Sequence, residues 1–125
     1  MSWSSSVSHP YKLVSREFRQ EDSVVRVGDV EFGGDAVTVI AGPCAVESYE
    51  QTLRIAREVQ AAGARMLRGG AYKPRTSPYS FQGLGVEGLE ILARVREETG
   101  MPVVTEAVGI EVIDGVAEFA DMVQI

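Results

Sequence analysis

The sequence predicts an α/β protein built from parallel βα units, and two observations carry that prediction. Short apolar runs typical of strands alternate with segments of helical apolar spacing across residues 37–125. Glycine or proline follows most of these segments, as expected where strands and helices end. Strands that alternate with helices are joined by right-handed crossovers, so we expect one parallel sheet.

Two alternating runs ahead of this region predict a β-hairpin. Val25–Val27 and Val30–Phe32 flank the pair Gly28-Asp29, which is a common hairpin turn sequence. The chain therefore divides into three predicted parts: a leader or linker at 1–10, a linker and hairpin at 11–35, and the βα domain at 36–125.

The elements of the βα domain follow in order. Strands are expected at 37–40, 64–68, 103–105 and 122–125, with helices near 48–62, 86–99 and 110–119. The first strand is rich in β-branched residues and is predicted to be buried. Ser48 and Gln51 have the spacing of a capping box, and Gly63 suits the residue after the first helix. Gly115 weakens the third helix, and the fourth strand presents an apolar edge to which another chain could pair.

Composition excludes several classes of function. The 125 residues carry 12 Lys and Arg against 18 Asp and Glu, a net charge of −6, which disfavours nucleic-acid binding. We expect no membrane segment, because no apolar run approaches the roughly 20 residues that a membrane helix needs. The first residues do not resemble a secretory signal, and a single cysteine fits a reducing, cytoplasmic setting. One cysteine and one histidine cannot build a four-ligand zinc site of the Cys and His type.

Chemically informative side chains follow the predicted strands. Cys44, Arg68, Glu106 and Gln124 lie at or just after the ends of the four strands in turn. Loops at the carboxyl ends of parallel strands converge, and binding sites of α/β proteins form there. Each residue has a plain structural alternative, such as a buried small cysteine or a solvated charge. Their shared position favours one site.

The segment 69–83 predicts an anion-binding loop. Lys73, Arg75 and Thr76 follow closely behind Arg68 in an acidic chain. Arginine binds carboxylate or phosphate oxygens with two parallel hydrogen bonds, and lysine adds a point charge. The alternative is a solvated basic loop without a ligand.

Two motifs resemble a known enzyme family. Residues 39–48 (VIAGPCAVES) and 67–83 (LRGGAYKPRTSPYSFQG) resemble 3-deoxy-D-arabino-heptulosonate 7-phosphate synthase (DAHP synthase), type I-beta, and the resemblance runs from about 11 to 125. It implies a (β/α)8 TIM barrel, of which this chain would be the first half, strands 1 to 4. It also implies an aldol-type transferase for the first step of the shikimate pathway to aromatic amino acids. Phosphoenolpyruvate condenses there with erythrose 4-phosphate, and phosphate is released.

The resemblance assigns roles to five residues around the two substrates. Arg68 and Lys73 match the phosphoenolpyruvate-binding pair, and Glu106 matches an acidic residue beside that substrate. Arg75 and Thr76 match the residues that hold erythrose 4-phosphate. Of these, Lys73 and Glu106 are also the expected catalytic residues.

A divalent metal ion, Mn²⁺ or similar, is implied as the cofactor, and Cys44 matches its cysteine ligand. The remaining ligands of the family come from later strands and have no matching positions here. We therefore expect a truncated or split chain that holds half an active site and is inactive alone. The open fourth strand suggests a homo-oligomer or a complementing partner chain.

Two alternatives remain. The sister synthase that uses arabinose 5-phosphate is disfavoured by Lys73-Pro74-Arg75-Thr76, where that family typically has an Asn-Arg-Ser pattern. The other alternative is a non-catalytic half-barrel that binds phosphorylated ligands or assembles with a partner chain.

Overall fold

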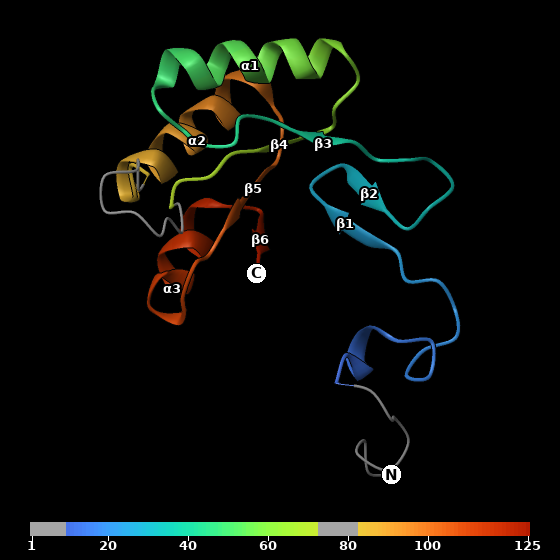
Figure 1. Cartoon of the computed structure of the whole chain (residues 1–125). Helices are drawn as coiled ribbons and strands as arrows, with labels where there is room; N and C mark the ends of the chain where they lie inside the picture. The colour runs from blue at the N-terminus through green and yellow to red at the C-terminus, as the bar shows by residue number, and fades with distance from the viewer. Residues whose placement is uncertain (1–9, 73–82) are drawn as a thin grey trace.

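The computed structural model describes residues 10–72 and 83–125, and the predicted leader lies almost wholly outside them (Figure 1). A 3-10 helix, η2 (Lys12–Val14), precedes two antiparallel strands, β1 (Val25–Val27) and β2 (Val30–Phe32), which form the predicted hairpin. The later elements are, in order, β3 (Ile40–Ala41), α1 (Tyr49–Ala61), β4 (Met66–Arg68), α2 (Val86–Thr99), β5 (Val103–Glu106), α3 (Ile110–Phe119) and β6 (Met122–Gln124).

The four later strands form one parallel sheet in the order β3-β4-β5-β6. Ile40 pairs with Met66, Leu67 with Val103, and the last residue of β5 with Gln124. Figure 1 shows α1, α2 and α3 on the same side of this sheet. The predicted α/β class of parallel βα units is thus confirmed, with strands in sequence order as in the first part of a (β/α)8 barrel.

The helix α1 begins with the predicted cap, in a modified form. Ser48 is the N-cap, and its hydroxyl accepts a hydrogen bond from the Gln51 amide at 3.1 Å. The Gln51 side chain accepts from the Glu47 amide at 3.1 Å, whereas the reciprocal box would place that bond on Ser48. Gly63 then leaves the helix with a φ of +110°, a conformation that favours glycine.

The hydrophobic core lies between the helices and the sheet. Leu67 and Val103 come from neighbouring strands and contact apolar side chains of the helices. The main cluster comprises Val46, Ala56, Ala64, Leu67, Ile91, Leu92, Val95, Met101 and Val103. A second cluster joins α2 to α3 through Ala71, Leu89 and Val116. Because side chains alternate along a strand, Arg68, next to Leu67, lies on the face away from the helices.

The predicted burial of the first strand is wrong. The strand is Ile40–Ala41 rather than 37–40, and Val37, Val39 and Ile40 are 91%, 48% and 39% exposed. A β-branched run indicates an extended conformation, but burial requires a layer on both sides. The strand β3 is an edge of the described sheet, and the helices pack on one face only.

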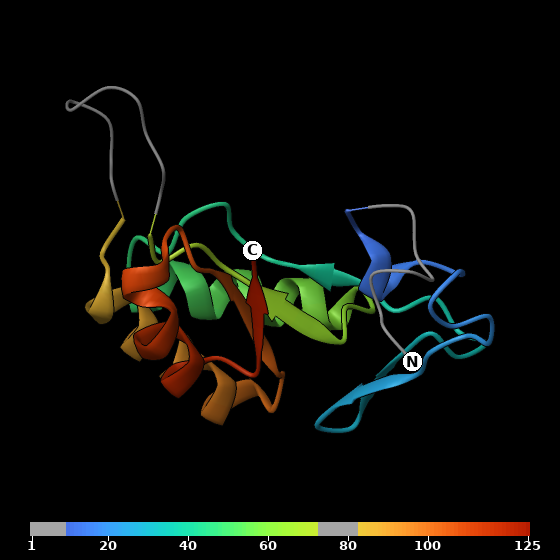
Figure 2. The ribbon, with the colours of Figure 1, turned by 90° about the horizontal axis from the view of Figure 1, so that it is seen from below.

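The hairpin lies at the end of the sheet where the strands begin (Figures 1 and 2). A Cβ on Gly28, in the hairpin turn, would lie 3.5 Å from the ring of Pro102, just ahead of β5. Val30 is only 1% exposed, so the hairpin contributes to the packed interior. The carboxyl ends of the strands therefore lie at the opposite end of the sheet, which we call the carboxyl edge. No described helix is long and apolar enough to cross a membrane.

Asp121 ties the start of two strands together and is expected to matter for stability. Its carboxylate accepts from the Val103 amide at 2.8 Å and from Arg96 Nη1 at 3.0 Å. We expect Asp121→Ala to lower the free energy of unfolding by about 2 kcal/mol, because the buried Val103 amide loses its charged acceptor. Urea unfolding measures this.

Glu98→Ala is the control for Asp121→Ala. It removes an exposed pair with Arg57 whose atoms are 3.8 Å apart, and should cost less than about 0.5 kcal/mol. Equal losses in the two variants would contradict the assigned role of Asp121.

Candidate functional site at the carboxyl ends of the strands

Arg68 is the residue that joins the strand ends. Its Nη1 donates to the carbonyl oxygen of Cys44 at 2.9 Å and to that of Pro43 at 3.5 Å. On the other side its Nε donates to Oε1 of Gln124, also at 3.5 Å. A side chain from β4 therefore links the loop after β3 to the end of β6.

Gly42 permits this arrangement because β3 and β4 approach closely at their carboxyl ends. A Cβ at position 42 would overlap the carbonyl oxygen of Arg68 and lie 2.8 Å from its carbonyl carbon. Only glycine leaves room for this contact between backbones. Pro43 then follows in a buried position and directs the chain toward α1.

Glu106 ends β5 at the same edge. Its Cα pairs with that of Gln124, and the next amide, Ala107, donates to the Gln124 carbonyl at 2.9 Å. The side chain of Glu106 is half-buried. The predicted gathering of Cys44, Arg68, Glu106 and Gln124 at one edge is confirmed, although Glu106 is the last residue of its strand rather than the residue after it.

The positive charge of Arg68 is not compensated by a described carboxylate. Its partners within the described residues are two backbone carbonyls and an amide oxygen, all neutral. The ion pairs that the structure describes use other arginines, at positions 16, 19, 26, 57 and 96. A half-buried guanidinium held by neutral oxygens favours an anionic ligand.

The first stem of the predicted anion loop is bonded to the loop after β3, to β5 and to the second stem. The Gly70 carbonyl accepts from the Val46 amide at 2.9 Å, and the Ala71 carbonyl accepts from the Gly85 amide at 2.9 Å. The Ala71 amide donates to the hydroxyl of Thr105 at 3.4 Å. Lys73, Arg75 and Thr76 fall between the stems and lie outside the described residues. Their roles stay predictions.

Thr105 is a site residue that the sequence reasoning missed. It is fully buried on β5, next to Glu106, and its hydroxyl is the described acceptor of the Ala71 amide. A threonine in a strand also suits the strand itself, so nothing in the sequence distinguishes this role. The carbonyls of Pro43 and Cys44 were missed for a simpler reason, since every residue has one.

Replacing Thr105 by valine should loosen the loop stem. Thr105→Val keeps the branched shape but leaves the buried Ala71 amide without its acceptor, which costs about 1–3 kcal/mol of unfolding free energy. Hydrogen exchange at Ala71 should also become faster. Thr105→Ser retains the hydroxyl and serves as the control, and unchanged protection of Ala71 in the valine variant would contradict this assignment.

A metal site is not complete within the described residues. They contain no group of three or more His, Cys, Asp or Glu side chains able to hold a metal ion. Cys44 is exposed at the carboxyl edge. As a single cysteine, it can supply one sulfur ligand to a metal ion. The implied divalent cofactor therefore does not fit the described residues alone.

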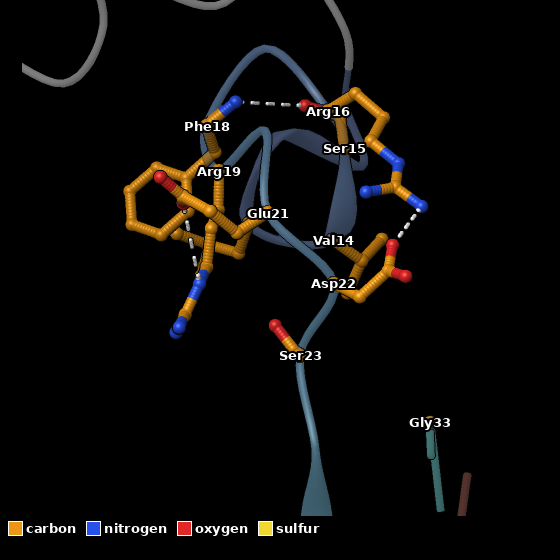
Figure 3. Close-up of a pocket in the computed structure, with 10 residues that line it drawn as sticks. Val14, Ser15, Arg16, Phe18, Arg19, Glu21, Asp22, Ser23 and Gly33 are labelled. Carbon is orange, nitrogen blue, oxygen red and sulfur yellow. Dashed lines mark hydrogen bonds and ion pairs between the residues drawn. The ribbon is translucent and has the colours of Figure 1, made fainter. Parts of the chain in front are cut away.

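Two concavities offer alternative sites. One of about 480 Å³ lies in the N-terminal segment, lined by 13–16, 18, 19, 21–23 and 33 (Figure 3). Its charged groups are paired with one another, with Arg16 2.6 Å from Asp22. A second, of about 320 Å³, adjoins Glu106 and is lined mainly by apolar side chains such as Ile110 and Ile113. Only the second borders the carboxyl edge.

Comparison with known proteins assigns this arrangement to a family. The model of the DAHP synthetase I family matches residues 14–125, which includes every element from β1 to β6. The chain belongs to the DAHP synthetase I family. It is 56% identical over 119 residues to a phospho-2-dehydro-3-deoxyheptonate aldolase of Thermotoga maritima. It is 38% identical over 109 residues to a 2-dehydro-3-deoxyphosphooctonate aldolase of Syntrophotalea carbinolica.

Solved members of the family have the same fold. The crystal structure of the DAHP synthase from Thermotoga maritima superposes with a TM-score of 0.85 at 55% identity, over 95% of this chain. A truncated form of the 3-deoxy-D-arabino-heptulosonate 7-phosphate synthase from that organism gives 0.77 at 48% identity, over 92% of this chain. The chain spans 35% of the length of the first of these structures and 41% of the second. The predicted first half of a TIM barrel is confirmed as the fold.

Proposed function

We propose that this protein acts as a DAHP synthase, which condenses phosphoenolpyruvate with erythrose 4-phosphate and releases phosphate. The observation that carries the proposal is Arg68, whose uncompensated guanidinium is fixed at the carboxyl edge by the carbonyl of Cys44 and the side chain of Gln124. The 56% identity to the Thermotoga maritima aldolase supports the same activity. Because the chain spans 35% of that relative, the activity of the whole protein is part of the proposal.

The proposed chemistry uses the residues as binding and orienting groups. Arg68, with Lys73, binds an anionic group of phosphoenolpyruvate and holds its C3 toward the sugar aldehyde. Arg75 and Thr76 bind erythrose 4-phosphate. C3 attacks the aldehyde carbon, and the aldehyde oxygen gains a proton and becomes a hydroxyl. Water adds at C2 and loses a proton, and the bond between C2 and the phosphate oxygen then breaks, which releases phosphate and leaves C2 as a ketone. Glu106, at the end of β5, lies beside C2, and its carboxylate accepts the proton that the attacking water loses.

We propose Cys44 as one ligand of the divalent metal, Mn²⁺ or similar. The described residues do not supply the remaining ligands of such a site. Cys44 is exposed on the loop after β3 and directly follows Pro43. Its backbone carbonyl accepts a hydrogen bond from the Arg68 guanidinium, so the two residues are neighbours.

The test is the consumption of phosphoenolpyruvate by the 125-residue chain with erythrose 4-phosphate and Mn²⁺ present. Cys44→Ala is the control, together with binding of phosphoenolpyruvate alone by calorimetry. Turnover that depends on Cys44 supports the full proposal. Binding without turnover is the result expected for a chain that holds half an active site and is inactive alone, and it also fits the alternative of a non-catalytic half-barrel for phosphorylated ligands. The absence of both contradicts the proposed function.

The sister reaction with arabinose 5-phosphate is a second candidate, favoured by the 38% identity to a 2-dehydro-3-deoxyphosphooctonate aldolase. The higher identity to the heptonate aldolase and the sequence Lys73-Pro74-Arg75-Thr76 support erythrose 4-phosphate. We expect erythrose 4-phosphate to be the faster substrate of a catalytically competent assembly. Faster turnover of arabinose 5-phosphate would reverse the assignment.

We also propose a cytoplasmic protein that assembles with a second copy or a complementing chain. Val39 and Ile40 are 48% and 39% exposed at an edge of the described sheet, and such edges pair readily. Sedimentation velocity at micromolar concentration tests this, and a well-folded monomer as the sole species would contradict it.

A further inference from the structure

Gln124 contacts Arg68 from β6 and was given no role by the motifs above. Its Oε1 accepts from Arg68 Nε at 3.5 Å. Its backbone is fixed by β5, because its carbonyl accepts from the Ala107 amide at 2.9 Å and its Cα pairs with that of Glu106. The acceptor for Arg68 is therefore presented from an ordered strand end.

The Cys44 carbonyl holds the guanidinium from the opposite side. With Nη1 donating to that carbonyl at 2.9 Å and Nε donating to Gln124, two of the three guanidinium nitrogens are occupied. Two contacts on opposite sides fix the plane of the group. Among the described residues Nη2 has no hydrogen-bond partner, and it is the nitrogen that an anionic ligand would contact.

The residue type at 124 matters as much as its position. A carboxylate there would bind the guanidinium more strongly through a charge-assisted hydrogen bond, but it would also cancel the charge. An apolar side chain would leave Nε without this acceptor. An amide supplies the acceptor and leaves the positive charge intact.

We infer that Gln124 is a positioning residue that orients Arg68 for a phosphate or carboxylate ligand while leaving its charge uncompensated. The inference rests on the proposed function only in taking phosphoenolpyruvate as the physiological ligand. Apart from that, the inference states only that a neutral acceptor, the Gln124 side chain, orients the Arg68 guanidinium toward an oxyanion.

The test uses the 125-residue chain and two substitutions, Gln124→Glu and Gln124→Met. Gln60→Glu is the matched control, because Gln60 bonds to the Thr99 carbonyl at 2.9 Å and the substitution makes the same change in net charge. Calorimetry measures the affinity for inorganic phosphate and for phosphoenolpyruvate. Proton–nitrogen NMR follows the Nε–Hε resonance of Arg68, and thermal unfolding reports the stability of each variant.

We expect Gln124→Glu to weaken phosphate binding at least about tenfold while the thermal midpoint is unchanged or raised. Gln124→Met should shift the Arg68 Nε–Hε resonance and weaken binding about threefold, as expected for one neutral hydrogen bond. Gln60→Glu should change neither the resonance nor the affinity appreciably. A purely structural role predicts that the charged substitution would preserve binding.

Three results would overturn the inference: an unchanged phosphate affinity in Gln124→Glu, an unmoved Arg68 resonance in Gln124→Met, or no binding of either anion by the parent chain. Phosphate binding that depends on Gln124, with phosphoenolpyruvate bound no more tightly than phosphate, supports the inference. That result would count against the proposed DAHP synthase function alone.

Discussion

Gly42→Ala should lower the free energy of unfolding by about 3 kcal/mol or more, a large effect for the addition of one methyl group. The new Cβ would overlap the carbonyl oxygen of Arg68 and lie 2.8 Å and 3.0 Å from its carbonyl carbon and amide nitrogen. These are backbone atoms of β4, so no side-chain rotation relieves the overlap. The edge strand β3 must move away from β4.

The same substitution should weaken anion binding, because the displaced loop carries the Cys44 carbonyl that holds Arg68. Chemical unfolding and calorimetry with phosphoenolpyruvate measure the two effects. Gly115→Ala is the matched control, since Gly115 lies in α3 and a Cβ there meets no atom within 4 Å. It should stabilise the chain by about 0.5–1 kcal/mol. A Gly42→Ala variant as stable as the parent would refute the close approach of β3 and β4.

Arg68→Ala should reduce the affinity for phosphoenolpyruvate about 30-fold or more, equivalent to about 2 kcal/mol or more. The guanidinium is the described cation that contacts both the loop after β3 and the end of β6. Its removal takes away the charge and the Nη2 donor together. Arg68→Lys keeps the charge without the planar fork and should give an intermediate loss.

Arg16→Ala is the control for Arg68→Ala. Arg16 pairs with Asp22 at 2.6 Å, and the two side chains are 70% and 72% exposed in the N-terminal segment. Removal of this exposed pair should leave phosphoenolpyruvate binding unchanged. Equal calorimetric effects of the two alanine substitutions would show that Arg68 is an ordinary surface charge.

Local patterns in the sequence were sufficient for the elements and their order. The alternation around Gly28 predicted β1 and β2, and the N-cap at Ser48 was found where the capping spacing placed it. Hydrogen bonding and side-chain direction within one strand or one helical turn depend on neighbours in the chain. Right-handed crossovers between consecutive strands then fix the order β3-β4-β5-β6.

The sequence by itself thus determined the fold class, the family motifs and the set of residues at the carboxyl ends of the strands. Only the tertiary structure decided how these residues are held. The bond from Arg68 to the Cys44 carbonyl, the acceptor role of Gln124 and the buried hydroxyl of Thr105 each join strand ends far apart in the chain. The exposure of Val37 also depends on the tertiary structure, because burial requires other elements to pack over the side chain. Such contacts depend on which backbone atoms the packed sheet brings within hydrogen-bond distance, and residue type and spacing do not specify that.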